Sequence, residues 1–192
     1  MNKRNVIAGA AVAALLLTAT PSLAVADDNV SRTGNYTVPA GKKIDGNLTV
    51  RSGTVTIRGE VDGNVRQIGS GSVVIAKTGK VDGNVSESGA GSVTTYGEVD
   101  GNISEADSGD LNVRASGKVD GNVTENGAGT LRVYGKVDGN VTENGTGQLY
   151  LFKTARVDGN VTEKSDGNLF VYKGAKVDGK ISENGAGVRR NL

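Results

Sequence analysis

Val81-Asp82-Gly83-Asn84-Val85 is one copy of a five-residue pattern that occurs eight times between Ile44 and Ile181. Successive copies begin 17, 20, 18, 20, 18, 20 and 20 residues apart. This period is too short for a repeat of two helices and is typical of one turn of a β-solenoid. The pattern therefore predicts an all-β, single-domain parallel β-helix. The copies begin at Ile44, Val61, Val81, Val99, Val119, Val137, Val157 and Val177.

Each repeat of 18 to 20 residues divides into three short edges, which predicts triangular coils. In the repeat that begins at Val81, we expect these edges at residues 81–86, 87–92 and 93–98. Side chains alternate between the two faces of a strand. The aliphatic residues of the first and third edges are therefore expected inside the coil, and the Asp and Asn of the pattern outside. The middle edge is rich in glycine, as a sharp bend requires.

One coil buries only a few aliphatic side chains, so stability must come from stacking the coils at about 4.8 Å per turn. We expect eight coils over residues 44–192, after an irregular lead-in at residues 27–43. A solenoid leaves an unpaired strand at each end, and no amphipathic helix follows the last repeat to cover it. End-to-end assembly is therefore physically possible.

Residues 1–26 have the pattern of a cleaved export signal. Lys3 and Arg4 precede an apolar run, and the small residues Ala24 and Ala26 form a typical cleavage motif. The apolar run, residues 6–17, is too short to span a bilayer. We therefore expect a mature protein that is secreted or associated with the cell surface, with no membrane insertion after the signal is cleaved.

The composition argues against several classes of function. The chain has 22 Lys and Arg against 21 Asp and Glu, so its charge does not favour nucleic acid as a partner. It has no His and no Cys, which excludes disulfides and catalysis by either residue. No corner grows by more than two extra residues, so no long loops are available to build a cleft. We predict no enzyme, no catalytic residue and no cofactor.

Stacked coils turn the Asp of each repeat into a row of carboxylates about 4.8 Å apart. Such carboxylates repel one another, which could favour divalent cations bound between coils. Local turn hydrogen bonds and the Lys or Arg that precedes most copies explain the row without an ion. We therefore predict no resident metal and keep this row as the only candidate for one. Its residues are Asp45, Asp62, Asp82, Asp100, Asp120, Asp138, Asp158 and Asp178.

Two further rows follow from the repeat. The Asn residues, from Asn47 through Asn160, are expected to hydrogen bond to one another along the axis. A row of glutamates opens the middle edge, and we expect it to form a solvated outer face. The glutamates are Glu87, Glu105, Glu125, Glu143, Glu163 and Glu183.

Aromatic residues occupy outward positions of the third edge. Tyr134, Phe152 and Tyr172 are expected to stack in one row, with Tyr150 and Phe170 beside them. Apolar rings on an outer face are unusual enough to predict a binding surface for another rod, a glycan or a cell-wall polymer. Stacking between coils, which would stiffen the C-terminal half, explains the same five residues without a partner.

The Val-x-Gly-Asn-Val cores, preceded by Gly-Lys or Gly-Glu as at Gly79-Lys80 and Gly97-Glu98, resemble the bactofilins, which are polymer-forming bacterial cytoskeletal proteins. The resemblance covers Ile44 to about Gly187. It implies a right-handed triangular β-helix whose subunits join end to end into nucleotide-free filaments. The same six-residue pieces also fit left-handed hexapeptide β-helices, so the handedness stays open. Bactofilins act mostly inside the cell, and the export signal departs from that pattern.

We therefore expect an exported structural or interaction protein with a rod-like solenoid. Self-association would occur end to end or through the aromatic row. The alternative is a binding module at the cell surface that recognises cell-wall glycan or divalent cations without assembling.

Overall fold

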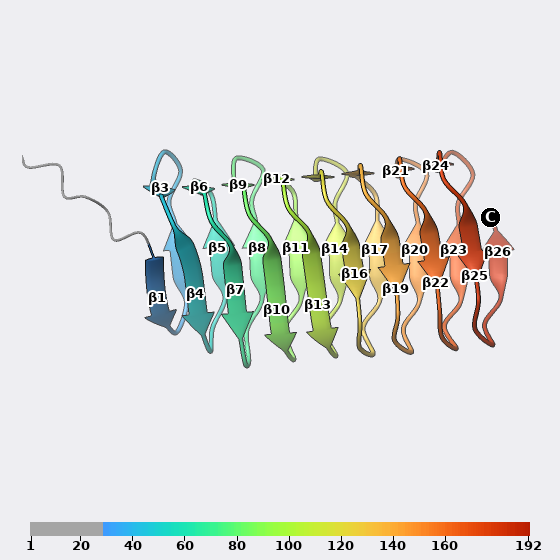
Figure 1. The fold of residues 1–192 in the computed structure, drawn as a ribbon, viewed down its shortest axis with the longest axis horizontal. Coiled ribbons are helices and arrows are strands. Elements are labelled where there is room, and N and C mark those ends of the chain that lie inside the picture. The colour runs from blue at the N-terminus through green and yellow to red at the C-terminus, as the bar shows by residue number, and fades with distance from the viewer. Residues whose placement is uncertain (1–28) are drawn as a thin grey trace, which may run out of the picture.

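The computed structural model describes residues 29–192, where the chain forms 26 short strands and no helix. The strands make three parallel sheets, in which each strand pairs with its counterparts one turn before and one turn after. Figure 1 shows a rod along which the chain advances from left to right. The strands on the near side run downward and those behind them run upward, so the winding is right-handed. The predicted all-β parallel β-helix is confirmed.

Sheet A faces the viewer in Figure 1 and has nine strands. They are β1 (Asn29–Thr33), β4 (Asn47–Arg51), β7 (Val65–Ile68), β10 (Val85–Gly89), β13 (Ile103–Asp107), β16 (Val123–Glu125), β19 (Val141–Glu143), β22 (Val161–Glu163) and β25 (Ile181–Glu183).

Sheet B lies behind it and also has nine strands. They are β2 (Tyr36–Val38), β5 (Val55–Ile57), β8 (Val73–Ile75), β11 (Val93–Thr95), β14 (Leu111–Val113), β17 (Leu131–Val133), β20 (Leu149–Leu151), β23 (Leu169–Val171) and β26 (Arg189–Asn191).

Sheet C runs along the top of the rod and has eight two-residue strands. They are β3 (Lys43–Ile44), β6 (Glu60–Val61), β9 (Lys80–Val81), β12 (Glu98–Val99), β15 (Lys118–Val119), β18 (Lys136–Val137), β21 (Arg156–Val157) and β24 (Lys176–Val177).

The interior of the rod is a column of branched aliphatic side chains from all three sheets. Val81 and Val85 are fully buried, and Val85 pairs in register with Ile103 of the next turn. Thr95, a polar residue among the inward positions of sheet B, is also buried, and its hydroxyl donates to the carbonyl of Gly97 at 3.3 Å. Because each turn covers the edges of its neighbours, the core is continuous only as long as the turns stay in register.

The structure has nine turns where the sequence predicted eight. The additional turn begins with β1, in which Asn29 pairs with Asn47, and continues with β2, in which Tyr36 pairs with Val55. The lead-in predicted at residues 27–43 is therefore regular from Asn29 onward. Its sequence lacks the repeat because β1 has a neighbour on one side only and remains mostly exposed, so inward aliphatic residues are less necessary there.

The corners also differ from the prediction. Val81 ends β9 in sheet C, whereas Val85 begins β10 in sheet A, so the edge predicted at residues 81–86 is divided between two sheets. Gly83 lies in the corner between them, where a Cβ would approach the carbonyl carbon of Gly63 in the preceding turn to 2.6 Å. Only glycine allows the stacked corners to come this close. The strand of sheet A then continues through Glu87 and turns that side chain inward.

The predicted signal peptide, residues 1–26, lies outside the described residues. Within residues 29–192, no helix is long and apolar enough to cross a membrane.

Candidate functional site

The aromatic face consists of Tyr134, Tyr150, Phe152, Phe170 and Tyr172, on or just after the strands of sheet B. Phe152 stacks between Tyr134 and Tyr172, with ring centroids 3.9 Å and 5.0 Å away. Tyr150 stacks on Phe170 at 4.6 Å and approaches Phe152 at 5.9 Å. The structure thus brings together all five predicted residues, because rings at equivalent positions of successive turns lie one above the other.

A shallow depression of about 280 Å³ lies against one edge of the aromatic face. Its walls are the rings of Tyr134, Phe152 and Tyr172, and Lys153 and Lys173 lie at its rim. The Arg114 guanidinium lies 5.8 Å from the centroid of the Tyr134 ring and extends the positive border. Flat rings beside cationic groups suit a partner with apolar faces and polar or anionic substituents.

The Asp row is an ion-pair row along sheet C. Lys80 lies 2.7 Å from Asp82 of its own turn and 3.1 Å from Asp100 of the next. Lys118 likewise joins Asp120 at 2.7 Å to Glu98 at 3.1 Å. Hydrogen bonds from these lysines to the carboxylates raise the pKa of Lys80 and Lys118 above the ordinary value. Each of these lysines thus lies between two carboxylates and offsets part of the charge of the row.

Along sheet C, two groups of three carboxylates, each made of one Glu and two residues of the Asp row, have the spacing of a metal site. One consists of Glu60, Asp62 and Asp82, and the other of Glu98, Asp100 and Asp120. The oxygens of each group lie within 4.8 Å of one another. Lysine ammonium groups already contact both groups, so the protein itself offsets part of the negative charge that would attract a divalent cation.

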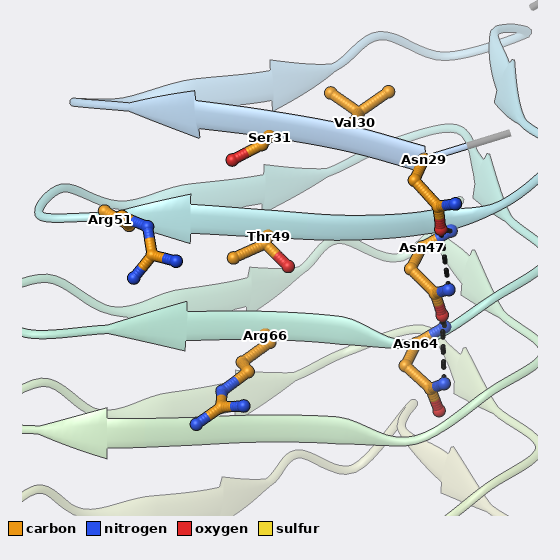
Figure 2. A pocket seen from close by; sticks show the side chains of 8 residues that line it. All are labelled: Asn29, Val30, Ser31, Asn47, Thr49, Arg51, Asn64 and Arg66. Carbon is orange, nitrogen blue, oxygen red and sulfur yellow. Dashed lines mark hydrogen bonds between the residues drawn. The ribbon is translucent and has the colours of Figure 1, made fainter. Parts of the chain in front are cut away.

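Sheet A carries the predicted Asn row on its outer face. The side-chain amide of Asn64 donates to Asn47 at 2.9 Å, and the amide of Asn47 donates to Asn29 at 2.7 Å (Figure 2). Beyond Thr49 in the same view lie the guanidinium groups of Arg51 and Arg66. They border an open depression of about 450 Å³ with no acidic lining residue, which sequence analysis did not identify.

The glutamate row was predicted to be solvated, and that prediction is wrong. Glu87 is 1% exposed and the next four glutamates are fully buried, with Glu183 half-buried at the end of the rod. Their side chains point into the core because each lies two residues after an inward Val or Ile of sheet A, as Glu125 follows Val123. The alternation of inward and outward residues can be read from the sequence. A corner was predicted directly before each glutamate, so the alternation was not continued to that residue.

Comparison with known protein families gives one match. The profile of the family described as Bactofilin, polymer-forming cytoskeletal, matches residues 36–126 and residues 87–182. The two segments together span 36–182, which is 147 of the 192 residues. Neither the curated proteins nor the solved structures include a match. Sequence match, parallel β-helix and right-handed winding agree, and the chain belongs to the bactofilin family of polymer-forming cytoskeletal proteins.

Proposed function

We propose that this chain is an exported structural protein whose rods join end to end into filaments. The observation that carries this proposal is the exposure of hydrophobic side chains on the last turn. Among residues 29–192, the exposed large hydrophobic side chains are Tyr96, Val188 and Leu192, and two of these three lie on the last turn. Arg189 and Asn191 take the register of the inward Leu169 and Val171, so the apolar surface of the last turn comes from Val188 and Leu192, which a second rod would cover.

The edges of the sheets support the same proposal. Among the described strands, β25 and β26 pair on one side only, as do β1 and β2 at the opposite end of the rod. Unpaired backbone groups at a strand edge are a template for pairing with another chain. A subunit that continued the parallel sheets would satisfy these groups and bury Val188 and Leu192 in one step. Family membership supports polymer formation independently of this geometry.

Electron microscopy and light scattering of the protein that begins at Asp27 test the proposal. We expect filaments of the wild type and single rods of the double variant Val188→Asp, Leu192→Asp. Both residues are exposed in the single rod, so the variant is expected to fold. Tyr96→Asp is the matched control, since Tyr96 is exposed on the side of the rod, and it should still form filaments. A wild type that stays monomeric at high concentration would refute end-to-end assembly.

Export is tested separately, by expressing the whole chain in a bacterium and fractionating the culture. The pattern of residues 1–26 supports a mature protein outside the cytoplasm that begins at Asp27. N-terminal sequencing of the exported fraction should then read Asp27-Asp28-Asn29. Full-length protein retained in the cytoplasm would contradict export and leave end-to-end assembly untouched.

The aromatic face favours a second function, binding of cell-wall glycan. The depression bordered by Tyr134, Phe152 and Tyr172 offers flat apolar walls, and Lys153 and Lys173 add positive charge at its rim. Co-sedimentation with purified cell-wall glycan tests it, with Phe152→Ser, Phe170→Ser as the variant expected to lose retention. Leu192 also lines this depression, so the control is Val188→Asp alone, which should keep glycan binding. Equal retention of wild type and the Phe variant would exclude this function.

A further inference from the structure

The buried glutamates form one continuous row inside the solenoid, which we call the interior glutamate row. In sheet A, Glu87 pairs in register with Glu105, and the register continues turn by turn to Glu183. Strands of a sheet lie about 4.8 Å apart, so successive carboxyl groups are immediate neighbours. A row of acids in this position is not required for packing, because the first turns place Val50 and Gln67 at the same register.

Each carboxyl group after Glu87 uses one oxygen to hold its own corner, whereas both oxygens of Glu87 have no partner among the described residues. The backbone N–H of Gly127 donates to Oε1 of Glu125 at 2.7 Å, and that of Gly145 donates to Oε1 of Glu143 at 2.8 Å. The second oxygen of these two glutamates is buried and has no donor among the described residues, and the same holds for Glu105 and Glu163. A buried acceptor without a donor is costly, and a proton held within the row would supply such a donor.

The groups that face the row include no cation along most of its length. From the described strands of sheets B and C, the inward residues that face the row are aliphatic, apart from Thr95 and, at the last turn, Arg189 and Asn191. Arg189 donates to the carbonyl of Ile181 at 3.4 Å, next to the half-buried Glu183. At the other end lie the uncharged Gln67 and the carboxylate of Asp107, which raises the pKa of Glu87 further.

Burial and neighbouring carboxyl groups both raise the pKa of Glu105 and Glu143, whereas at Glu87 and Glu163 burial raises the pKa and a hydrogen bond with an adjacent glutamate lowers it. The pKa of Glu105 is raised to about 8 and that of Glu143 to about 9, and burial is the largest cause of both shifts. Hydrogen bonds with the next glutamate in the row add to the shift at both residues. Burial also raises the pKa of Glu87 and of Glu163.

We propose that the interior glutamate row holds shared protons at neutral pH, so that neighbouring carboxyl groups are joined by O–H···O hydrogen bonds and the rod loosens when alkali removes the protons. A protonated carboxyl group donates one hydrogen bond and still accepts others, which supplies the missing donor for the second oxygen of its neighbour. Loss of these protons leaves adjacent buried carboxylates that repel each other.

The sign of the pH effect follows from proton binding in the two states. In the unfolded chain these glutamates titrate near 4.5, whereas in the folded chain Glu105 and Glu143 keep their protons to about pH 8 and 9. Between these limits the folded state binds more protons, so stability falls as the pH rises. The stabilising contribution is fully present below pH 4.5 and is lost as the pH passes through about 8 to 9.

Thermal unfolding of the whole mature protein between pH 5 and pH 9.5 tests this proposal. For the wild type we expect the melting temperature to fall by at least about 4 °C over this range. The double variant Glu105→Gln, Glu143→Gln should flatten the dependence, because Gln supplies an N–H donor at any pH and Gln67 already occupies this row. Glu60→Gln, Glu98→Gln is the matched control on the exposed side, and it should keep the wild-type slope.

Infrared spectroscopy of the wild type gives a second test that does not depend on whether the Glu105→Gln, Glu143→Gln variant folds. Protonated carboxyl groups absorb separately from carboxylates, and we expect the protonated band to persist at pH 7 in the folded protein and to disappear on unfolding. A melting temperature that is constant or rises with pH, or a folded protein without the protonated band at pH 7, would overturn the proposal. If the protonated band is absent and calcium raises the melting temperature at pH 9, the row holds cations instead of protons.

Discussion

Phe152 lies face to face with Tyr134, with ring centroids 3.9 Å apart and ring planes within 3° of each other. The two residues are 18 positions apart in sequence, which is one turn of the solenoid. They stack on the outside of the rod because both occupy the outward position just after a strand of sheet B. The same relationship repeats between Phe152 and Tyr172.

Phe152→Ala is expected to destabilise the rod, since one substitution removes both stacked contacts of the row. Aromatic pairs contribute about 0.5–1.5 kcal/mol each, so the free energy of unfolding should fall by about 1–3 kcal/mol. Urea denaturation followed by circular dichroism measures the change. Tyr96→Ala, which removes an exposed ring with no stacked neighbour ring, should cost less than Phe152→Ala. Equal costs would mean that the stacking contributes nothing to stability.

Asn122→Asp is expected to break the Asn row. The Asn122 amide donates to Asn102 at 3.0 Å, and its Oδ1 accepts the backbone N–H of Asn140 at 2.8 Å. An aspartate would place an acceptor against the oxygen of Asn102, at a cost of about 1–3 kcal/mol in the free energy of unfolding. Thr124→Asp adds the same charge to the outer face of the same turn without entering the row, and a smaller loss is expected there.

Gly121→Ala is expected to disturb the stacking of two turns. A Cβ at this position would lie 2.6 Å from the carbonyl carbon and oxygen of Gly101 in the turn before, and backbone cannot move aside as a flexible side chain can. Overpacking of this kind costs about 1–3 kcal/mol. Lys77→Ala on an exposed corner is the control and should leave the melting temperature almost unchanged. A Gly121→Ala variant as stable as that control would show that adjacent turns can separate freely.

Calcium and chelators are expected to leave the wild-type melting temperature unchanged, because lysine ammonium groups already lie between the carboxylates along sheet C. Lys118 contacts Glu98 and Asp120, two of the three acids in one group with metal-site spacing. Lys118→Met should expose that group, and millimolar calcium should then raise the melting temperature of this variant by binding the folded state. Calcium stabilisation of the wild type would instead favour a resident cation in the Asp row.

The interior glutamate row shows where sequence reasoning succeeded and where it stopped. Inward aliphatic positions were predictable, because a residue such as Val123 repeats at a fixed place in every coil. Glu125 was placed outside because an acid in an apolar core is unfavourable and the corner was set one residue before it. The structure moves the corner to Asp-Gly-Asn, and alternation along β16 then turns Glu125 inward. An acidic residue type is therefore a weak predictor of solvent exposure where stacked carboxyl groups can share protons.

The first turn was predicted only as an irregular lead-in, for a related reason. Residues Asn29–Val38 carry no copy of the five-residue pattern, and periodicity was the evidence used to count coils. Their strands form because backbone hydrogen bonds to β4 and β5 do not depend on side-chain identity. A terminal turn has only one neighbour, so the side-chain pattern that identifies an internal turn is less strictly required there.

The sequence alone determined the repeat, the parallel β-helix and the rows of equivalent residues, because a period of 18 to 20 residues places like side chains one above another. The tertiary structure decided where each coil bends, and hence which rows lie inside. It placed the glutamates in the core, and it fixed the geometry of the predicted rows, with Lys80 3.1 Å from Asp100 of the next turn and the rings of Tyr134 and Phe152 3.9 Å apart. These outcomes depend on contacts between turns, and a pattern within one repeat does not contain them.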